Sequence, residues 1–192
     1  MNATDIRRAL DKGQYEQTEA GLLLKQTRVL VRGLYEHWVN GGDYRADHNI
    51  VTDEGLINLL NVNYAGTAAT ATWYLSLYSG AYTPVAGLTA ASYPAAAGEI
   101  TSGTEGYSEA TRVTYNETAA TSTPVITNTA NKANFTIATA STVTVNGAAL
   151  HSISTKGATT GVLSSAVKFA AARTLYNTDV FTLAYSTTLA SS

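Results

Sequence analysis

The strongest constraint on the fold is a strict alternation of apolar and polar residues that begins at residue 73. In residues 73–78 this alternation places Trp73, Leu75 and Leu77 on one face, as in a half-buried strand. Similar segments recur to the end of the chain, rich in Thr, Val and Tyr: 111–115, 134–138, 141–145, 148–153, 162–169 and 180–186. About seven short strands predict a mainly β fold, an antiparallel β-sandwich with a jelly-roll-like body.

Turn residues separate these expected strands. Asn146-Gly147 is the strongest hairpin signal, because both central residues of a type I′ turn need positive φ. Residues 177–179 mark another turn. Residues 82–106 have weak periodicity and predict a long loop, of the kind that is functional or disordered until bound.

The first part of the chain has a different pattern, and we expect a partly helical arm over residues 1–61, followed by the body over 62–192. Thr4 or Asp5 can cap a short helix that carries Ile6 and Leu10 and ends near Gly13. Residues 22–38 show helical spacing, although Val29–Val31 also suits a strand. Thr52 can cap a further helix over residues 53–62.

Charge divides the chain in the same way. Of the 12 Lys and Arg and 14 Asp and Glu, seven and nine respectively lie in the first 54 residues. Apolar residues are interspersed with these charges, so the arm needs a partner, either the chain's own body or another subunit. The residues expected to dock on a partner are Leu30, Leu34, Tyr35, Trp38, Leu56 and Leu60.

Composition excludes several classes of protein. A net charge of -2 leaves no basic excess for binding phosphates, so no nucleic-acid partner is expected. The chain has no cysteine, which rules out disulfides and thiolate zinc sites. The first residues carry no apolar secretory segment, and runs such as Leu22–Leu24 are far shorter than a membrane span. We therefore expect synthesis in the cytoplasm and no membrane partner.

No pattern of residues indicates catalysis, a cofactor or a metal. Asp43, Asp47 and His48 form the most suggestive cluster, but Arg45 lies between them, and a solvated turn with internal salt bridges explains them better. The body has only five acids, expected as surface carboxylates: Glu99, Glu105, Glu109, Glu117 and Asp179. Motifs of serine hydrolases, zinc proteases and phosphate-binding loops are absent from the sequence. His151, on an expected strand, is interpreted as structural or exposed, and we expect no enzyme.

Aromatic residues leave one alternative open. Tyr74, Tyr78, Tyr82 and Tyr93 could line one edge and stack on sugar rings, although tyrosines on strands more often pack half-buried. The alternative function is therefore a receptor- or glycan-binding module.

Several short motifs resemble small virion proteins of tailed bacteriophages. They are residues 49–60 (NIVTDEGLINLL), 72–78 (TWYLSLY), 82–84, 107–112 (YSEATR), 146–150 (NGAAL), 160–163 and 179–185 (DVFTLAY). Over about residues 49–188 the chain looks like capsid decoration (cement) or head-fibre-like proteins. The resemblance implies a jelly-roll-like fold and a role on the outer surface of the capsid.

These observations lead to one functional hypothesis. The chain is expected to be a non-enzymatic virion protein that stabilises contacts between subunits of the major capsid protein. The arm would contact that protein or a sister subunit, and the body would form a homo-oligomer, with a trimer favoured over a dimer. The alternative is a head-fibre or tail-tip module that binds a receptor or glycan.

Overall fold

The computed structural model describes residues 3–11, 15–25 and 29–191, which form two units. One unit comprises Met1–Val31 with Leu189–Ser192, and the other comprises Arg32–Thr188. The predicted boundary at residue 61 is therefore wrong. Residues 32–64 belong to the second unit because their strands extend its sheets and their helix packs against one of them.

The first unit contains the helix α1 (Ala3–Asp11) and a small hairpin of β1 (Tyr15–Gln17) and β2 (Leu23–Lys25). The short first helix is confirmed, with Ile6 and Leu10 half-buried. Its expected end at Gly13 lies outside the described residues. Thr18 closes the hairpin, since its backbone N–H donates to the Leu22 carbonyl at 2.9 Å.

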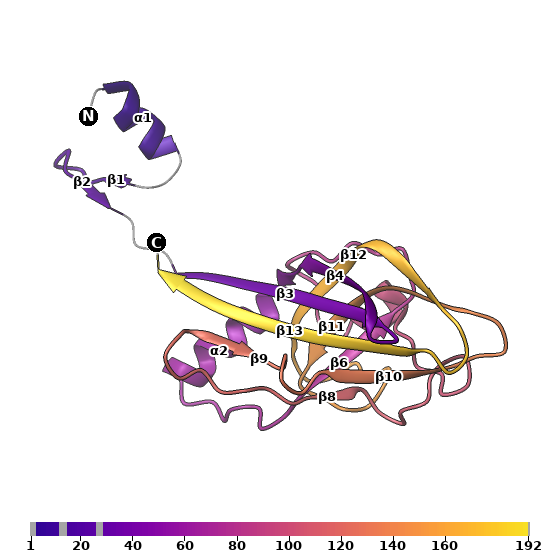
Figure 1. Ribbon diagram of the computed structural model, residues 1–192. Coiled ribbons are helices and arrows are strands. Elements are labelled where there is room, and N and C mark those ends of the chain that lie inside the picture. The colour runs from indigo at the N-terminus through magenta and orange to yellow at the C-terminus, as the bar shows by residue number, and fades with distance from the viewer. Residues whose placement is uncertain (1–2, 12–14, 26–28, 192) are drawn as a thin grey trace. The chain divides into compact units, whose positions relative to one another are not determined.

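The second unit is the expected antiparallel β-sandwich (Figure 1). Sheet one has the order β4-β3-β13-β10-β7, and β9 also pairs with β13. Its strands are β4 (Gly42–His48), β3 (Val29–Val39), β13 (Val180–Ser191), β10 (Ala133–Ala138), β7 (Gly106–Tyr107) and β9 (Val125–Thr127). Sheet two has the order β5-β12-β11-β6-β8. Its strands are β5 (Ile50–Val51), β12 (Leu163–Leu175), β11 (Val143–His151), β6 (Trp73–Tyr78) and β8 (Val113–Tyr115).

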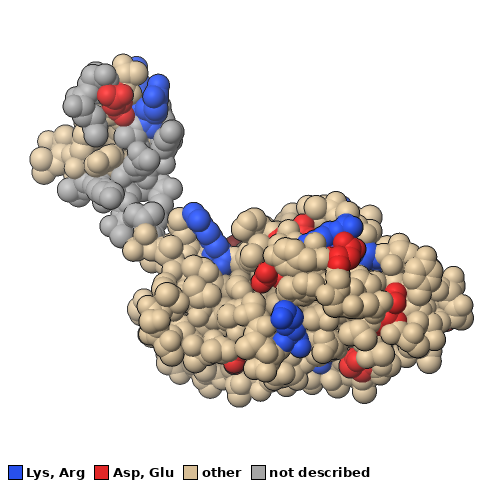
Figure 2. All heavy atoms as spheres, viewed as in Figure 1, with Lys and Arg blue, Asp and Glu red and all other residues tan. Residues whose placement is uncertain are grey.

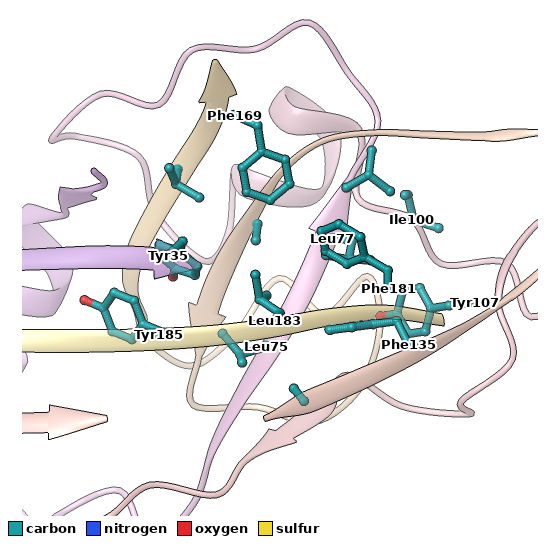
Figure 3. Packing of buried hydrophobic residues seen from close by; sticks show 14 of the residues in the cluster. Tyr35, Leu75, Leu77, Ile100, Tyr107, Phe135, Phe169, Phe181, Leu183 and Tyr185 are labelled. Atoms are coloured by element: carbon teal, nitrogen blue, oxygen red, sulfur yellow. The ribbon is translucent and has the colours of Figure 1, made fainter. Parts of the chain in front are cut away.

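The main core fills the space between the two sheets (Figure 3). Tyr107 meets Phe135 edge-on, with ring centroids 5.0 Å apart, and Tyr35 lies 4.4 Å from Tyr185. Alternate residues of β10 are buried, namely Ala133, Phe135 and Ile137, as its period-two pattern requires.

A second core covers the opposite face of sheet two, where a loop was expected. Leu88, Ala90, Tyr93 and Ala97 are buried there against sheet two. Within this segment, Pro94–Gly98 forms a short π-helix, η1. The expected long loop is confirmed as irregular apart from η1, but it packs as a layer, because its small apolar residues fit closely against the sheet.

Two predictions about local structure are wrong. Residues 29–39 form β3 rather than part of a helix over 22–38, and the alternating burial of Gly33, Tyr35 and His37 shows why period two prevails. Asn146-Gly147 makes no hairpin, because β11 runs through it with a register shift between Val145 and Gly147. Gly147 is needed there because a Cβ would collide with the Val167 carbonyl and the Tyr78 ring.

Candidate interaction surface

The helix α2 (Asp53–Tyr64) is fixed to the sandwich by its first turn. The Thr52 hydroxyl accepts a hydrogen bond from the Gly55 N–H at 3.0 Å, as the predicted cap requires. The same hydroxyl donates to the Leu163 carbonyl of β12. Glu54 accepts from the backbone N–H groups of Ala90 (2.8 Å) and Leu163 (2.7 Å). Gly55 lies so close to Ser164 that a Cβ would collide with its carbonyl oxygen.

Beyond this first turn, α2 presents apolar side chains to solvent. Ile57, Leu60 and Tyr64 are 56%, 57% and 86% exposed, at positions i, i+3 and i+7 along one stripe. The opposite stripe includes the buried Gly55 and the half-buried Asn58 and Val62. A helix of a single folded domain normally has the reverse arrangement, with its larger apolar residues facing inward.

This helix begins a segment without formal charge. No Lys, Arg, Asp, Glu or His occurs from Gly55 to Gly98. Figure 2 shows one face of the molecule on which charged side chains are scattered over a largely uncharged surface. Depletion of charge together with exposed large apolar side chains is typical of the centre of a protein–protein interface.

The six residues expected to dock on a partner differ in how far they are buried. Tyr35 is fully buried in the main core, where its hydroxyl is 2.9 Å from the Ser165 hydroxyl, so it cannot contact a partner. Leu30, Leu34 and Leu56 are half-buried. Leu60 is the exposed member. The sequence prediction included Leu56 and Leu60 of this helix and missed their neighbours Ile57 and Tyr64.

Trp38, the sixth residue, belongs to a second surface cluster on sheet one. Its ring centroid lies 5.2 Å from that of the exposed Tyr44, and the Lys132 ammonium lies 5.0 Å from the Trp38 ring centroid. The Tyr44 hydroxyl donates to Glu36 at 2.9 Å. Trp38 therefore remains a candidate contact residue, in a setting of strands rather than of a helix.

The two aspartates of β4, Asp43 and Asp47, bind different partners. Asp43 binds the Arg173 guanidinium and lies 3.6 Å from Arg45, which confirms the expected salt bridging. Asp47 lies 3.1 Å from His37 Nε2 and accepts from the Ala170 N–H at 2.9 Å. These residues lie on a strand instead of the expected turn. Within residues 3–11, 15–25 and 29–191, no group of three or more potential ligands could hold a metal ion.

His37 is the buried centre of this network. Arg173 Nε donates to its Nδ1 at 3.0 Å, and its ring stacks on Phe169 with centroids 4.0 Å apart. Burial lowers the pKa of His37, against the opposing effect of the hydrogen bond to Asp47. The network ties β3 and β4 of sheet one to β12 of sheet two.

A serine and a histidine lie together at the second core. The Ser76 hydroxyl is 2.8 Å from His151 Nε2 and 2.9 Å from the Tyr93 hydroxyl. All three side chains are almost completely buried, and burial lowers the pKa of His151 far below its ordinary value. No described group partners His151 Nδ1, so the structure shows no third residue that would orient the ring as in a hydrolytic triad. The contact joins β6 to β11.

Of two loop acids expected at the surface, Glu99 is buried and Glu105 is exposed, and both hold the fold together through hydrogen bonds. Glu99 forms a buried two-pronged ion pair with Arg112, with Nε–Oε1 and Nη2–Oε2 distances of 2.7 and 2.8 Å. Arg112 also donates to the Ile153 carbonyl at 3.0 Å. Glu105 accepts from the Thr139 hydroxyl and the Ala140 N–H, and these bonds lower its pKa.

The tyrosines considered for sugar binding do not form an exposed edge. Tyr78 and Tyr93 are fully buried and meet edge-on with ring centroids 6.1 Å apart. Tyr82 is half-buried against the second core. They pack as structural residues, as tyrosines on strands commonly do.

No family model matches the chain, and no curated protein matches its sequence. Among the described residues, no helix is both long and apolar enough to cross a membrane.

Proposed function

We propose that this chain is a non-enzymatic structural protein of a phage virion, a decoration or cement protein on the outer surface of the capsid. The observation that carries the proposal is the division between a complete sandwich and a separate N-terminal unit. That unit exposes Leu22 and Leu23, and Val29 at the start of β3 is also exposed, with exposed fractions of 63%, 38% and 68%. Exposed apolar residues on a small separate unit are suited to docking on a larger surface.

In this proposal the N-terminal unit binds the major capsid protein, and the sandwich bridges neighbouring capsid subunits. We therefore assign docking to Leu22 and Leu23 instead of to β3, because Tyr35 of β3 belongs to the core. A low-charge body favours repeated contacts, because like charges at symmetry-related positions would repel each other.

The test is the location of the protein on purified particles of the virus that encodes it. Quantitative mass spectrometry and immunogold labelling should find many copies spread over the head. Absence from the particle would overturn the proposal, and a few copies at a single vertex would favour the receptor-binding alternative.

A second test addresses the N-terminal unit. A variant lacking residues 1–28 retains all strands from β3 onward, whereas a deletion of residues 1–48 would also remove β3 and β4 from the sandwich. We expect the shorter deletion, and the double variant Leu22→Ser/Leu23→Ser, to lose capsid binding while the circular dichroism of the sandwich is retained. Full occupancy of capsids by both variants would contradict this role of the unit.

The alternative of a glycan-binding module is supported by one feature, the half-buried Trp38 beside the exposed Tyr44, with Glu36 and Lys132 next to them. An aromatic pair flanked by hydrogen-bonding groups can stack on a sugar ring. Saturable binding on a glycan array that is lost in Tyr44→Ala, with Tyr176→Ala as the exposed control, would favour this function.

A further inference from the structure

The solvent side of helix α2 carries larger apolar side chains than the solvent side of a surface helix normally does. Its inner stripe carries Gly55, Asn58 and the half-buried Val62, while the outer stripe carries the larger and more exposed Ile57, Leu60 and Tyr64. The positions i, i+3 and i+7 are those at which one helix packs along another. The outer stripe therefore has the geometry of a helix–helix contact, and no described helix of the same chain packs along it.

The surroundings of the helix extend this apolar surface. The N–H of Asp53 donates to the Ala86 carbonyl at 2.8 Å, which places the segment with the exposed Val85 beside the start of α2. Residues 65–69, directly after the helix, are exposed and uncharged. The surface is thus larger than the helix alone, as a stable interface requires.

The charge of this surface indicates which partner it fits. At a symmetry axis each residue lies near its own copy, so any charged residue would face a like charge. Residues 55–69 of the helix and its continuation, together with Val85, carry no formal charge, so copies of this surface can meet without that repulsion. A surface with these properties is suited to contact with an identical surface.

We propose that the outer stripe of α2, Ile57, Leu60 and Tyr64, forms a self-association surface at which the helices of two or more copies pack together about a symmetry axis. This inference deepens the proposed function by naming the contact between copies. It can be tested on purified protein without any capsid, so its failure would leave the capsid-binding proposal open to its own test.

The experiment uses the full chain and three variants in analytical ultracentrifugation. Leu60→Glu and Leu60→Lys each place like charges at the contact, and we expect at least about a tenfold rise in the dissociation constant for each. An equimolar mixture of the two should recover association, because Glu and Lys then meet across the axis. Tyr176→Lys changes an equally exposed residue elsewhere and should associate like the wild type. Thermal unfolding of each variant verifies that the sandwich is intact.

The outcomes are distinct. Wild-type oligomers, weakened single variants and a recovered mixture support the proposal. A monomeric wild type, or single variants that associate normally, would overturn it. A mixture that stays dissociated would show that the stripe meets a different surface and would also overturn the same-face contact.

A cysteine variant provides an independent measurement, since the native chain contains no cysteine. Tyr64→Cys should form a disulfide-linked dimer on mild oxidation at a concentration where Tyr176→Cys does not. Equal rates of cross-linking for the two variants would contradict a specific contact at α2.

Discussion

The interior of the sandwich and the outer side of α2 differ in how their side chains are buried and paired. In the interior, even a charged pair such as Arg112–Glu99 is completely buried and hydrogen-bonded on both prongs. On α2, the large apolar side chains of Ile57, Leu60 and Tyr64 remain in solvent although the first turn is firmly fixed. The apolar side chains of the sandwich interior are covered, whereas those on the outer stripe of α2 are exposed, and we propose that other copies cover them.

This difference distinguishes residues that stabilise the fold from residues available for assembly. Tyr35 and Leu60 were both expected to bind a partner, but only Leu60 is exposed enough to do so. Substitutions in the interior should therefore change the free energy of unfolding, and substitutions on the outer stripe should change association.

The largest effect is expected at the buried ion pair. Arg112→Met leaves the Glu99 carboxylate buried without its partner, which should lower the free energy of unfolding by about 3–5 kcal/mol. Arg45→Met, at an exposed pair with Asp43, should change it by less than about 1 kcal/mol. Urea denaturation measures both. The double variant Arg112→Met/Glu99→Met should be more stable than the single one, and failure to recover stability would contradict the charge argument.

The same truncation should have very different effects in the two regions. Leu183→Ala opens a cavity in the main core and should destabilise the protein by about 2–5 kcal/mol. Leu60→Ala removes a side chain that lies mostly in solvent and should stay within about 0.5 kcal/mol under conditions where the protein is monomeric. Similar losses in both variants, measured by denaturation, would remove the distinction between the regions.

Attachment of α2 to sheet two can be perturbed at Gly55. Gly55→Ala introduces a Cβ against the Ser164 carbonyl, and we expect a loss of about 1–3 kcal/mol from overpacking. Gly87→Ala, at a glycine with open space around it, is the matched control and should be close to neutral. An unchanged stability of Gly55→Ala would mean that the helix is not held as closely as the structure shows.

The smallest change is expected on mild acidification. Burial lowers the pKa values of His37 and His151 below the ordinary 6.5. Just below this pH the two histidines are therefore protonated in the unfolded state but neutral in the folded state. The unfolded state then binds more protons, and stability should fall as the pH drops below about 6.5, while remaining constant just above it. Denaturation at a series of pH values tests this, with His48→Gln, an exposed histidine, as the control. A stability that rises on acidification would contradict it.

Sequence periodicity predicted the strands well where one face is buried, as at Trp73–Tyr78, whose bounds match β6. It failed at residues 29–39, where the apolar spacing fits both periods and only pairing within sheet one decides between them. Asn146-Gly147 could not be interpreted correctly from local residues, because the crowding by Val167 and Tyr78 is tertiary. The outer stripe of α2 was missed in part because sequence alone does not show which side of a helix the sheet covers.

The most direct test of the account is the molar mass of the full chain in sedimentation equilibrium over a range of concentrations. The account predicts a mass that approaches an integral multiple of 20.2 kDa, because the α2 surface is completed by other copies. A mass of 20.2 kDa at every concentration would contradict it.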